Sequence, residues 1–402
     1  MKETFAELLS CDREYVLPTY GRDSMLVRGE GSKVWDFFDN EYLDFAMGIS
    51  VCNLGHCHPA VTEALCQQAA KLVHCSNLFY NENQPRLAAV IARNSFDGKV
   101  FFCNSGAEAN EGLIKFARRW GSRNGGRHEI ICATRAFHGR TLTTLAATAK
   151  LQYREGFAPD MKGFVFAEYN QLEAVAAAIN PCTVAILIEP IQGEGGVYPA
   201  SAEFIHGLRQ LCDEHNLLLL FDEVQSGMGR SGKYFAYQHY DVVPDGMSMA
   251  KALGNGFPMG AFEIGAEYGD LFAPGVHGST FGGTPLACAT SLAVFKVMEE
   301  EKVLENVQAM SSYLFGKLKE LQKRFSFIKD VRGMGLLVGV EVGDRVVALQ
   351  TACKKRRLLT LTAGEGVLRL LPSLKVTAAE IDQACDILAS ALAYVERSQT
   401  NQ

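Results

Sequence analysis

A lysine and an aspartate stand where a buried strand and the loop after it could bring them together for chemistry. The apolar run of residues 217–221 ends in Asp222, and Lys251 follows between the apolar residues Ala250 and Ala252. Such a run is typical of a buried strand in a parallel sheet, and active sites in these sheets lie at the carboxyl ends of the strands. Asp222 and Lys251 are therefore the first candidates for catalytic residues.

The residue types leave several roles open. Asp222 could be a metal ligand, a general base or the partner of a protonated ring nitrogen. A lysine is usually a solvated surface residue, but the neighbours of Lys251 are apolar. Because desolvation disfavours the ammonium form, a lysine held there would have a lowered pKa, which suits imine chemistry.

Three more motifs follow expected strands. Asn104-Ser-Gly-Ala-Glu108 joins a strand to a helix, where free backbone NH groups and the helix dipole could hold a phosphate, although a plain helix cap has the same pattern. Phe137-His-Gly-Arg-Thr141 could supply an aromatic face and a carboxylate-binding arginine, or be a surface loop. Glu189-Pro-Ile-Gln-Gly-Glu194 fits a site loop or a turn-rich connection. No Walker lysine follows the first motif, which disfavours a nucleoside triphosphate site.

Together these features fit one cofactor. A phosphate cradle, an aromatic face, a buried aspartate, a desolvated lysine and a carboxylate-binding arginine all follow strands of one sheet. Pyridoxal phosphate needs this set, since a lysine forms its Schiff base and an aspartate keeps its ring nitrogen protonated.

Strands and helices are expected to alternate in the middle of the chain. Strands are predicted at residues 99–103, 129–133, 183–188 and 217–221, and helices at 87–92, 107–120 and 202–215. This alternation indicates βαβ units and an α/β fold with a mainly parallel sheet flanked by helices. A chain of 402 residues exceeds one comfortable core, so two domains are expected. We predict a large cofactor-binding domain at 56–284 and a smaller α+β domain built from residues 1–55 and 285–402.

Composition excludes other classes of function. The net charge of −6 argues against nucleic-acid binding, and no apolar stretch is long enough to span a membrane. Twelve scattered cysteines, several in apolar runs, and the lack of a signal-like N-terminus predict a reduced, cytoplasmic protein. His56-Cys-His58 lies in a turn without a second ligand cluster, so no metal is expected.

The chain resembles the class III pyridoxal-phosphate-dependent aminotransferases of fold type I over nearly its whole length, and most closely those that act on acetylornithine. The resemblance rests on eight motifs: Leu54-Gly-His-Cys-His-Pro59, Phe102-Cys-Asn-Ser-Gly-Ala-Glu-Ala-Asn110, Phe137-His-Gly-Arg-Thr141, Glu189-Pro-Ile-Gln-Gly-Glu-Gly-Gly-Val197, Asp222-Glu-Val-Gln-Ser-Gly-Met-Gly-Arg230, Ala250-Lys-Ala-Leu-Gly254, His277-Gly-Ser-Thr-Phe-Gly-Gly283 and Val367-Leu-Arg-Leu370.

The resemblance implies a role for each matching residue. Lys251 would carry the cofactor covalently and Asp222 would pair with its ring nitrogen. The rest of the implied cofactor site consists of Ser105, Gly106, Ala107, Phe137, Glu189, Val224, Gln225 and Thr280. Thr280 would reach the cofactor of a neighbouring subunit, which implies a homodimer with shared active sites. The implied substrate-binding residues are Arg140, Glu194, Ser279, Arg369 and Tyr20.

The implied reaction moves the terminal amino group of N2-acetyl-L-ornithine to 2-oxoglutarate in a ping-pong cycle. Its expected place is in arginine biosynthesis, with arginine breakdown as the alternative. Glu194 and Arg369 would form a switchable pair that opens for glutamate. Succinylornithine, ornithine and 4-aminobutyrate remain alternative substrates within the family. A decarboxylase or racemase of the same fold, and a non-enzymatic binding protein, are further alternatives; retention of Lys251 and Asp222 disfavours the last.

Overall fold

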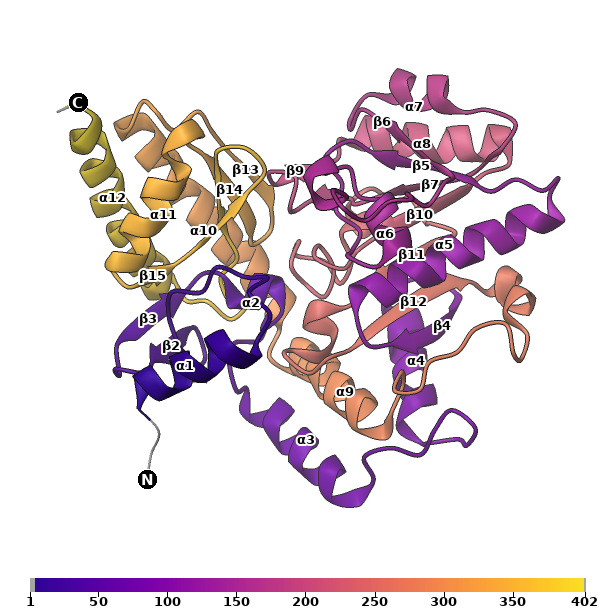
Figure 1. Ribbon diagram of the computed structural model, residues 1–402, viewed down its shortest axis with the longest axis horizontal. Helices are drawn as coiled ribbons and strands as arrows, with labels where there is room; N and C mark the ends of the chain where they lie inside the picture. The colour runs from indigo at the N-terminus through magenta and orange to yellow at the C-terminus, as the bar shows by residue number, and fades with distance from the viewer. Residues whose placement is uncertain (1–3, 401–402) are drawn as a thin grey trace.

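A seven-stranded sheet forms the centre of the larger lobe in the computed structural model, which describes residues 4–400 (Figure 1). Among the described strands of this sheet, β12 alone runs antiparallel to its neighbours, while the other pairs are parallel. In spatial order the strands are β4 (Gly98–Cys103), β12 (Gly260–Gly265), β11 (Gly246–Met249), β10 (Leu218–Asp222), β7 (Thr183–Ile188), β5 (Glu129–Ala133) and β6 (Phe164–Ala167).

The central strands are apolar on both faces because helices cover both faces. Every residue of β7 and β10 is buried, and α5 and α8 pack against these strands. The predicted α/β fold with a mainly parallel sheet is therefore confirmed. The helices of this lobe are α3 (Pro59–Lys71), α4 (Asn83–Asn94), α5 (Gly106–Arg123), α6 (Leu142–Ala146), α7 (Leu172–Ala178) and α8 (Ala202–His215).

Capping residues set the ends of the site-forming helices. The Ser105 hydroxyl accepts a hydrogen bond from the backbone N–H of Glu108 at 3.2 Å and so begins α5. Ser201 begins α8 in the same way, through the N–H of Phe204 at 3.1 Å. Asn216 adopts a left-handed conformation with φ of 49° and ends α8 directly before β10.

Both ends of the chain build the smaller lobe (Figure 1). The C-terminal strand β15 (Leu358–Leu359) pairs in parallel with the N-terminal strand β3 (Glu41–Asp44). The other strands of this lobe are β1 (Leu26–Glu30), β2 (Lys33–Asp36), β13 (Asp330–Met334), β14 (Leu337–Glu341), β16 (Leu361–Ala363) and β17 (Val367–Leu370). Its helices are α1 (Phe5–Tyr15), α2 (Met47–Ser50), α10 (Val303–Arg324), α11 (Val346–Lys355) and α12 (Ala378–Thr400).

Helix α9 (Pro285–Glu300) joins the two lobes. It packs against α3 and α4 on one side and contacts α10 on the other. The division of the chain at residues 55 and 284 stays a prediction. None of the helices within residues 4–400 combines the length and apolarity that crossing a bilayer requires.

Candidate active site

A cavity of about 320 Å³ lies at the carboxyl ends of the central strands. Its walls come from the segments that follow β4, β5, β7, β10 and β11, and from a loop that includes Phe257. Nine predicted cofactor residues and one predicted substrate residue line it: Ser105, Gly106, Ala107, Phe137, Glu189, Asp222, Val224, Gln225, Lys251 and Glu194. The structure thus brings together residues that are far apart in the sequence.

Lys251 follows β11 and opens a short 3₁₀ helix, η3 (Lys251–Gly254). Its φ of 47° is unusual for a residue with a side chain, and such backbone strain clusters at functional sites. Desolvation lowers the pKa of its ammonium group below the ordinary value, despite the opposing charges of Glu194 and Asp222. The environment therefore makes the neutral amine easier to reach than in a solvated lysine, and nucleophilic and proton-transfer chemistry uses that form.

Asp222 ends β10 with its side chain buried and held by donors. Its Oδ2 accepts hydrogen bonds from Asn110 Nδ2 at 2.7 Å and from His138 Nδ1 at 2.8 Å. Its Oδ1 accepts one from the backbone N–H of Val224 at 3.0 Å. Asn110 is itself oriented, because Ser248 donates to its amide oxygen at 2.6 Å. These contacts fix the direction of the carboxylate.

Asn110 and His138 were not identified from the sequence as positioning residues, although both lie inside recognised motifs. Burial disfavours the charged imidazole of His138, but the hydrogen bond and charge of Asp222 outweigh it and raise its pKa. Its second ring nitrogen, Nε2, is buried without a partner among the described residues. The sequence offered one sign for Asn110, namely a polar residue on the helix that begins at the predicted phosphate cradle.

Residues 104–107, which include the residues predicted to hold a phosphate, line the cavity at the start of α5. The helix is 18 residues long. Gly106 permits a close approach here, since a Cβ on it would lie 2.7 Å from Val224 Cγ1. A backbone cradle at the start of a long helix suits a phosphate group.

Phe137 and Glu189 are coupled on one wall of the cavity. The backbone N–H of Phe137 donates to Glu189 Oε1 at 3.0 Å, which fixes the loop after β5 to the loop after β7. Burial raises the pKa of Glu189 to about 7. The Phe137 ring stands perpendicular to Tyr153, with 6.3 Å between ring centroids.

Glu194 and Arg369 form an ion pair between the lobes. Arg369 Nη1, from β17, donates to Glu194 Oε1 at 2.6 Å and to Gln225 Oε1 at 2.9 Å. The Arg369 side chain is only 2% exposed. Burial works against the charge of Glu194, but Arg369 more than compensates and holds the pKa of that carboxyl below its usual value. The Glu194 carboxyl is therefore ionised near neutral pH.

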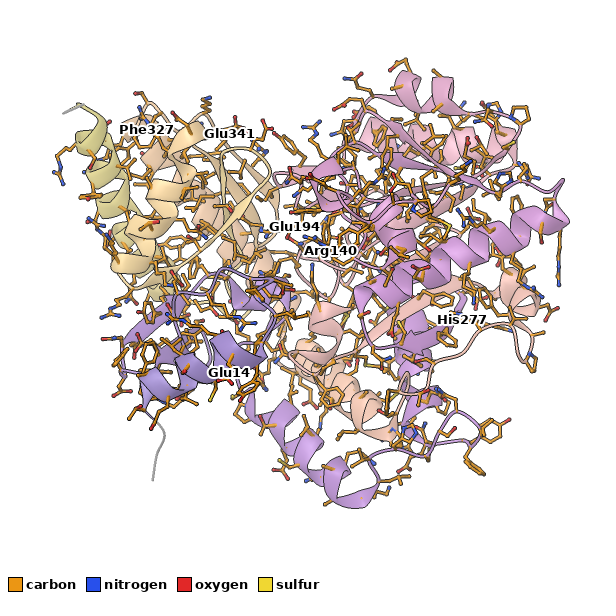
Figure 2. All side chains as sticks on the ribbon, in the orientation of Figure 1. Glu14, Arg140, Glu194, His277, Phe327 and Glu341 are labelled. Atoms are coloured by element: carbon orange, nitrogen blue, oxygen red, sulfur yellow. The ribbon has the colours of Figure 1, made fainter. Side chains whose placement is uncertain are left out.

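Two predicted substrate residues lie outside the Lys251 cavity. Arg140 stacks over the ring of Tyr153, 3.6 Å from its centroid, and lies 5.6 Å from that of Phe137. Arg140 and Tyr20 line a separate pocket next to this stack. Figure 2 shows Arg140 and Glu194 in the region between the two lobes. Among the described residues no carboxylate pairs with Arg140.

Ser279 and Thr280 also lie outside the Lys251 cavity, on a loop after β12. The Ser279 hydroxyl accepts hydrogen bonds from Asn104 Nδ2 at 3.3 Å and from the backbone N–H of Gly282 at 3.0 Å. The loop thus contacts the cradle segment through Asn104. Across residues 4–400, no group of three histidine, cysteine, aspartate or glutamate residues is arranged to hold a metal ion.

The family model for class-III aminotransferases matches residues 19–392. This chain belongs to the class-III aminotransferases. It is 47% identical to an acetylornithine aminotransferase of Caldanaerobacter subterraneus subsp. tengcongensis, over 96% of this chain and 100% of the relative. The predicted family, and with it the type of fold, is therefore confirmed.

Solved structures show the same architecture. An N-acetylornithine aminotransferase from Stenotrophomonas maltophilia is 36% identical, with a TM-score of 0.84 over 97% of this chain and 100% of that one. An ornithine aminotransferase from Toxoplasma gondii, with partial occupancy of pyridoxal phosphate at its active site, is 32% identical, with a TM-score of 0.94 over 99% and 96%.

Proposed function

We propose that this aminotransferase moves the terminal amino group of N2-acetyl-L-ornithine to 2-oxoglutarate, giving N-acetyl-L-glutamate 5-semialdehyde and L-glutamate. The observation that carries the proposal is the buried Glu194–Arg369 pair beside the Lys251 cavity, with Arg140 outside it and paired with no carboxylate of the described residues. In such a site the Arg140 guanidinium is always available to a substrate carboxylate, whereas the Arg369 guanidinium is available only when Glu194 releases it. The identity to acetylornithine enzymes supports the choice of substrate.

The two arginines match the two amino-acid substrates. Acetylornithine carries one carboxylate, which Arg140 takes while Glu194 keeps Arg369 neutralised. Glutamate carries two carboxylates, so Arg140 binds the side-chain carboxylate and Arg369 binds the α-carboxylate. Charge-assisted bidentate pairs of this kind are among the stronger hydrogen bonds in proteins.

We propose pyridoxal phosphate as the cofactor, because the cavity offers a matching group for each part of it. Residues 105–107 would hold the phosphate, Asp222 would face the ring nitrogen, and Phe137 would cover one ring face. Glu189, Val224 and Gln225 would complete the site, with Gln225 near the ring hydroxyl. When bound, this cofactor supplies an electron sink for the bond that breaks at the substrate carbon.

The protein's own groups then position charge and move protons. Asp222 stays directed at the cavity because Asn110 and His138 hold its Oδ2. Lys251, whose pKa is lowered by desolvation, can exist as the free amine. It takes the proton from the substrate carbon that bears the transferred amino group and later returns a proton as an acid.

A panel of half-reactions tests the proposed function. The holoenzyme is mixed separately with acetylornithine, succinylornithine, ornithine and 4-aminobutyrate, and loss of the cofactor's visible absorbance is followed. Acetylornithine is expected to react with the largest second-order rate constant. Faster reaction with any of the other three amines assigns a different substrate.

We also propose a homodimer with shared active sites. Thr280 does not line the cavity of its own chain. Exposed apolar side chains lie on its loop and on the neighbouring segment of residues 78–80. These are Leu78, Phe79, Tyr80 and Phe281. Exposed apolar patches of this kind mark protein–protein contacts.

Complementation distinguishes a shared site from a site within one chain. Lys251→Ala and Thr280→Ala chains are co-expressed and assayed at limiting cofactor. In a mixed dimer one site combines the intact Lys251 of one chain with the intact Thr280 of the other, so activity should recover. If mixed dimers are shown to form and activity does not recover, Thr280 acts on the site of its own chain.

We propose a cytoplasmic location and a place in arginine biosynthesis. All twelve cysteines are free, and six of them are buried. Free buried thiols are typical of reducing compartments. Fractionation of cells and loss of growth without arginine in a deletion strain test the two parts separately.

A further inference from the structure

A second pocket of about 360 Å³ adjoins the guanidinium of Arg140. Apart from Arg140 its walls are mainly aromatic and aliphatic, formed by Tyr20, Leu142, Leu145, Tyr153 and Phe157. Leu142 and Phe157 are 62% and 58% exposed, which is high for such large apolar side chains. Two exposed apolar side chains beside a guanidinium indicate a site for a ligand that carries both an apolar group and an anionic group.

Aromatic stacking fixes the cation between this pocket and the Lys251 cavity. The Arg140 guanidinium lies 3.6 Å from the Tyr153 ring centroid and 5.6 Å from that of Phe137, which lines the cavity. No aspartate or glutamate pairs with Arg140 in the described part of the chain. A guanidinium with stacking partners but no counter-ion is ready to receive a carboxylate.

The chemistry of the proposed substrate determines what must lie next to that carboxylate. In an N2-acylated ornithine, the α-carboxylate and the acylated nitrogen are attached to the same carbon. If Arg140 holds the carboxylate, the acyl group lies within a few bond lengths of the guanidinium. The pocket beside Arg140 is at that position.

We propose that Leu142 and Phe157, supported by Leu145 and Tyr153, bind the acyl group and select N2-acylated amines. This inference rests on the proposed function. It assigns the discrimination among terminal amines to this pocket rather than to the residues around Lys251.

Two more cations lie close to the pocket wall. Lys150 Nζ is 5.4 Å from the centroid of the Tyr153 ring, and Arg154 donates to the carbonyl of Leu145 at 3.3 Å. A neutral acyl group such as acetyl needs only the apolar side chains of the pocket.

The same charges disfavour an amine without an acyl group. Free ornithine carries an ammonium on its α-carbon, which would stand beside the Arg140 guanidinium. Like charges in close contact reduce affinity, and rejection of this kind adds to specificity. Acylation removes the positive charge and supplies apolar surface at the same time.

The test compares two half-reactions in variants of the holoenzyme. Leu142→Ala and Phe157→Ala are made, with Leu151→Ala as a matched control because Leu151 is 75% exposed and lies in the same segment without lining the pocket. Each variant is mixed with acetylornithine and, separately, with glutamate. Because glutamate has no acyl group, its reaction reports on folding, cofactor and Lys251 in the same protein.

The pocket variants should lower the second-order rate constant for acetylornithine by about 10-fold or more and that for glutamate by less than about 2-fold. The control should change neither. Equal loss with both substrates, or no loss with either, overturns the pocket assignment. Wild-type enzyme that reacts best with acetylornithine while the pocket variants behave normally overturns only this inference. Wild-type enzyme that prefers free ornithine or 4-aminobutyrate contradicts the pocket and the proposed function together.

Discussion

Arg369 on β17 donates to Glu194 in the loop after β7, with 2.6 Å between Nη1 and Oε1. The guanidinium also donates to Gln225 Oε1 at 2.9 Å, and its Nε is buried without a partner in the described chain. A buried arginine that loses its carboxylate needs another anion, because an unpaired buried charge is costly. Under the proposed switch, Glu194 is therefore expected to leave Arg369 only when a substrate carboxylate takes its place.

Replacing Glu194 tests this exchange. Glu194→Ala frees Arg369 permanently, so glutamate should bind better and acetylornithine worse. The ratio of their half-reaction rate constants should shift towards glutamate by about 10- to 100-fold, the range expected for a charge-assisted hydrogen bond. Glu194→Gln, which keeps the shape, should shift it less. An unchanged ratio in the alanine variant would exclude the switch.

Lys251→Ala should remove the covalent attachment of the cofactor. The purified variant is treated with borohydride and analysed by mass spectrometry for a cofactor adduct, beside the wild type. We expect an adduct on Lys251 in the wild type and none in the variant, with activity lost because Lys251 is the one lysine among the described residues that line the cavity. A trapped adduct in the variant would assign attachment to another lysine.

His138 should act by positioning Asp222. His138→Phe removes the donor to Asp222 Oδ2, whereas His138→Gln can keep one. The phenylalanine variant should lose about 10- to 100-fold in turnover, as supporting residues of other cofactor and metal sites do, and the glutamine variant less. The absorbance spectrum of the bound cofactor, measured across pH, should shift in the phenylalanine variant. Loss of activity with an unaltered spectrum would point to a purely structural role.

Glu263 should make stability depend on pH. It is fully buried on β12, accepts a hydrogen bond from Ser95 at 2.5 Å, and burial raises its pKa to about 8. Between pH 4.5 and about pH 8 the folded protein keeps the proton on Glu263. The unfolded chain has released that proton, because the ordinary pKa of the side chain is near 4.5. Because the folded state holds more protons in this window, stability falls as pH rises from about 4.5 to about 8.

Thermal melting of the wild type and of the Glu263→Gln variant measures this effect. The melting temperature is recorded from about pH 5 to about pH 9, a range that spans most of the window in which Glu263 titrates. The variant should lose less melting temperature than the wild type as pH rises, since its side chain cannot ionise. Parallel curves for the two proteins would show that Glu263 does not titrate in this range.

Several helices and the parallel strands β5, β7 and β10 were predictable because local pattern indicates them, whereas the parallel strands β6 and β11 were not predicted. The apolar run before Asp222 has no polar face, so it had to be a buried strand, and it became β10 (Leu218–Asp222). The antiparallel strand β12 was not identified. Its position between β11 and β4 depends on pairing across the sheet, as in Gly260 opposite Cys103, and no local pattern encodes this partner.

The meeting of Lys251 and Asp222 at one cavity was predictable, because both were expected at the carboxyl end of the sheet, while their chemical roles stay predictions. The support of Asp222 by Asn110 and His138 was not, because three separate segments meet there. The position of Arg140 in a pocket apart from Lys251 likewise depends on its stacking on Tyr153, which the sequence does not reveal.

Transfer of labelled nitrogen tests the central claim most directly. The holoenzyme is incubated with acetylornithine carrying ¹⁵N in its terminal amino group and with unlabelled 2-oxoglutarate. We predict that the label appears in glutamate in an amount equal to the semialdehyde formed, with no release of carbon dioxide. Label that stays in the ornithine, or carbon dioxide formed in place of labelled glutamate, would contradict transamination between these two substrates.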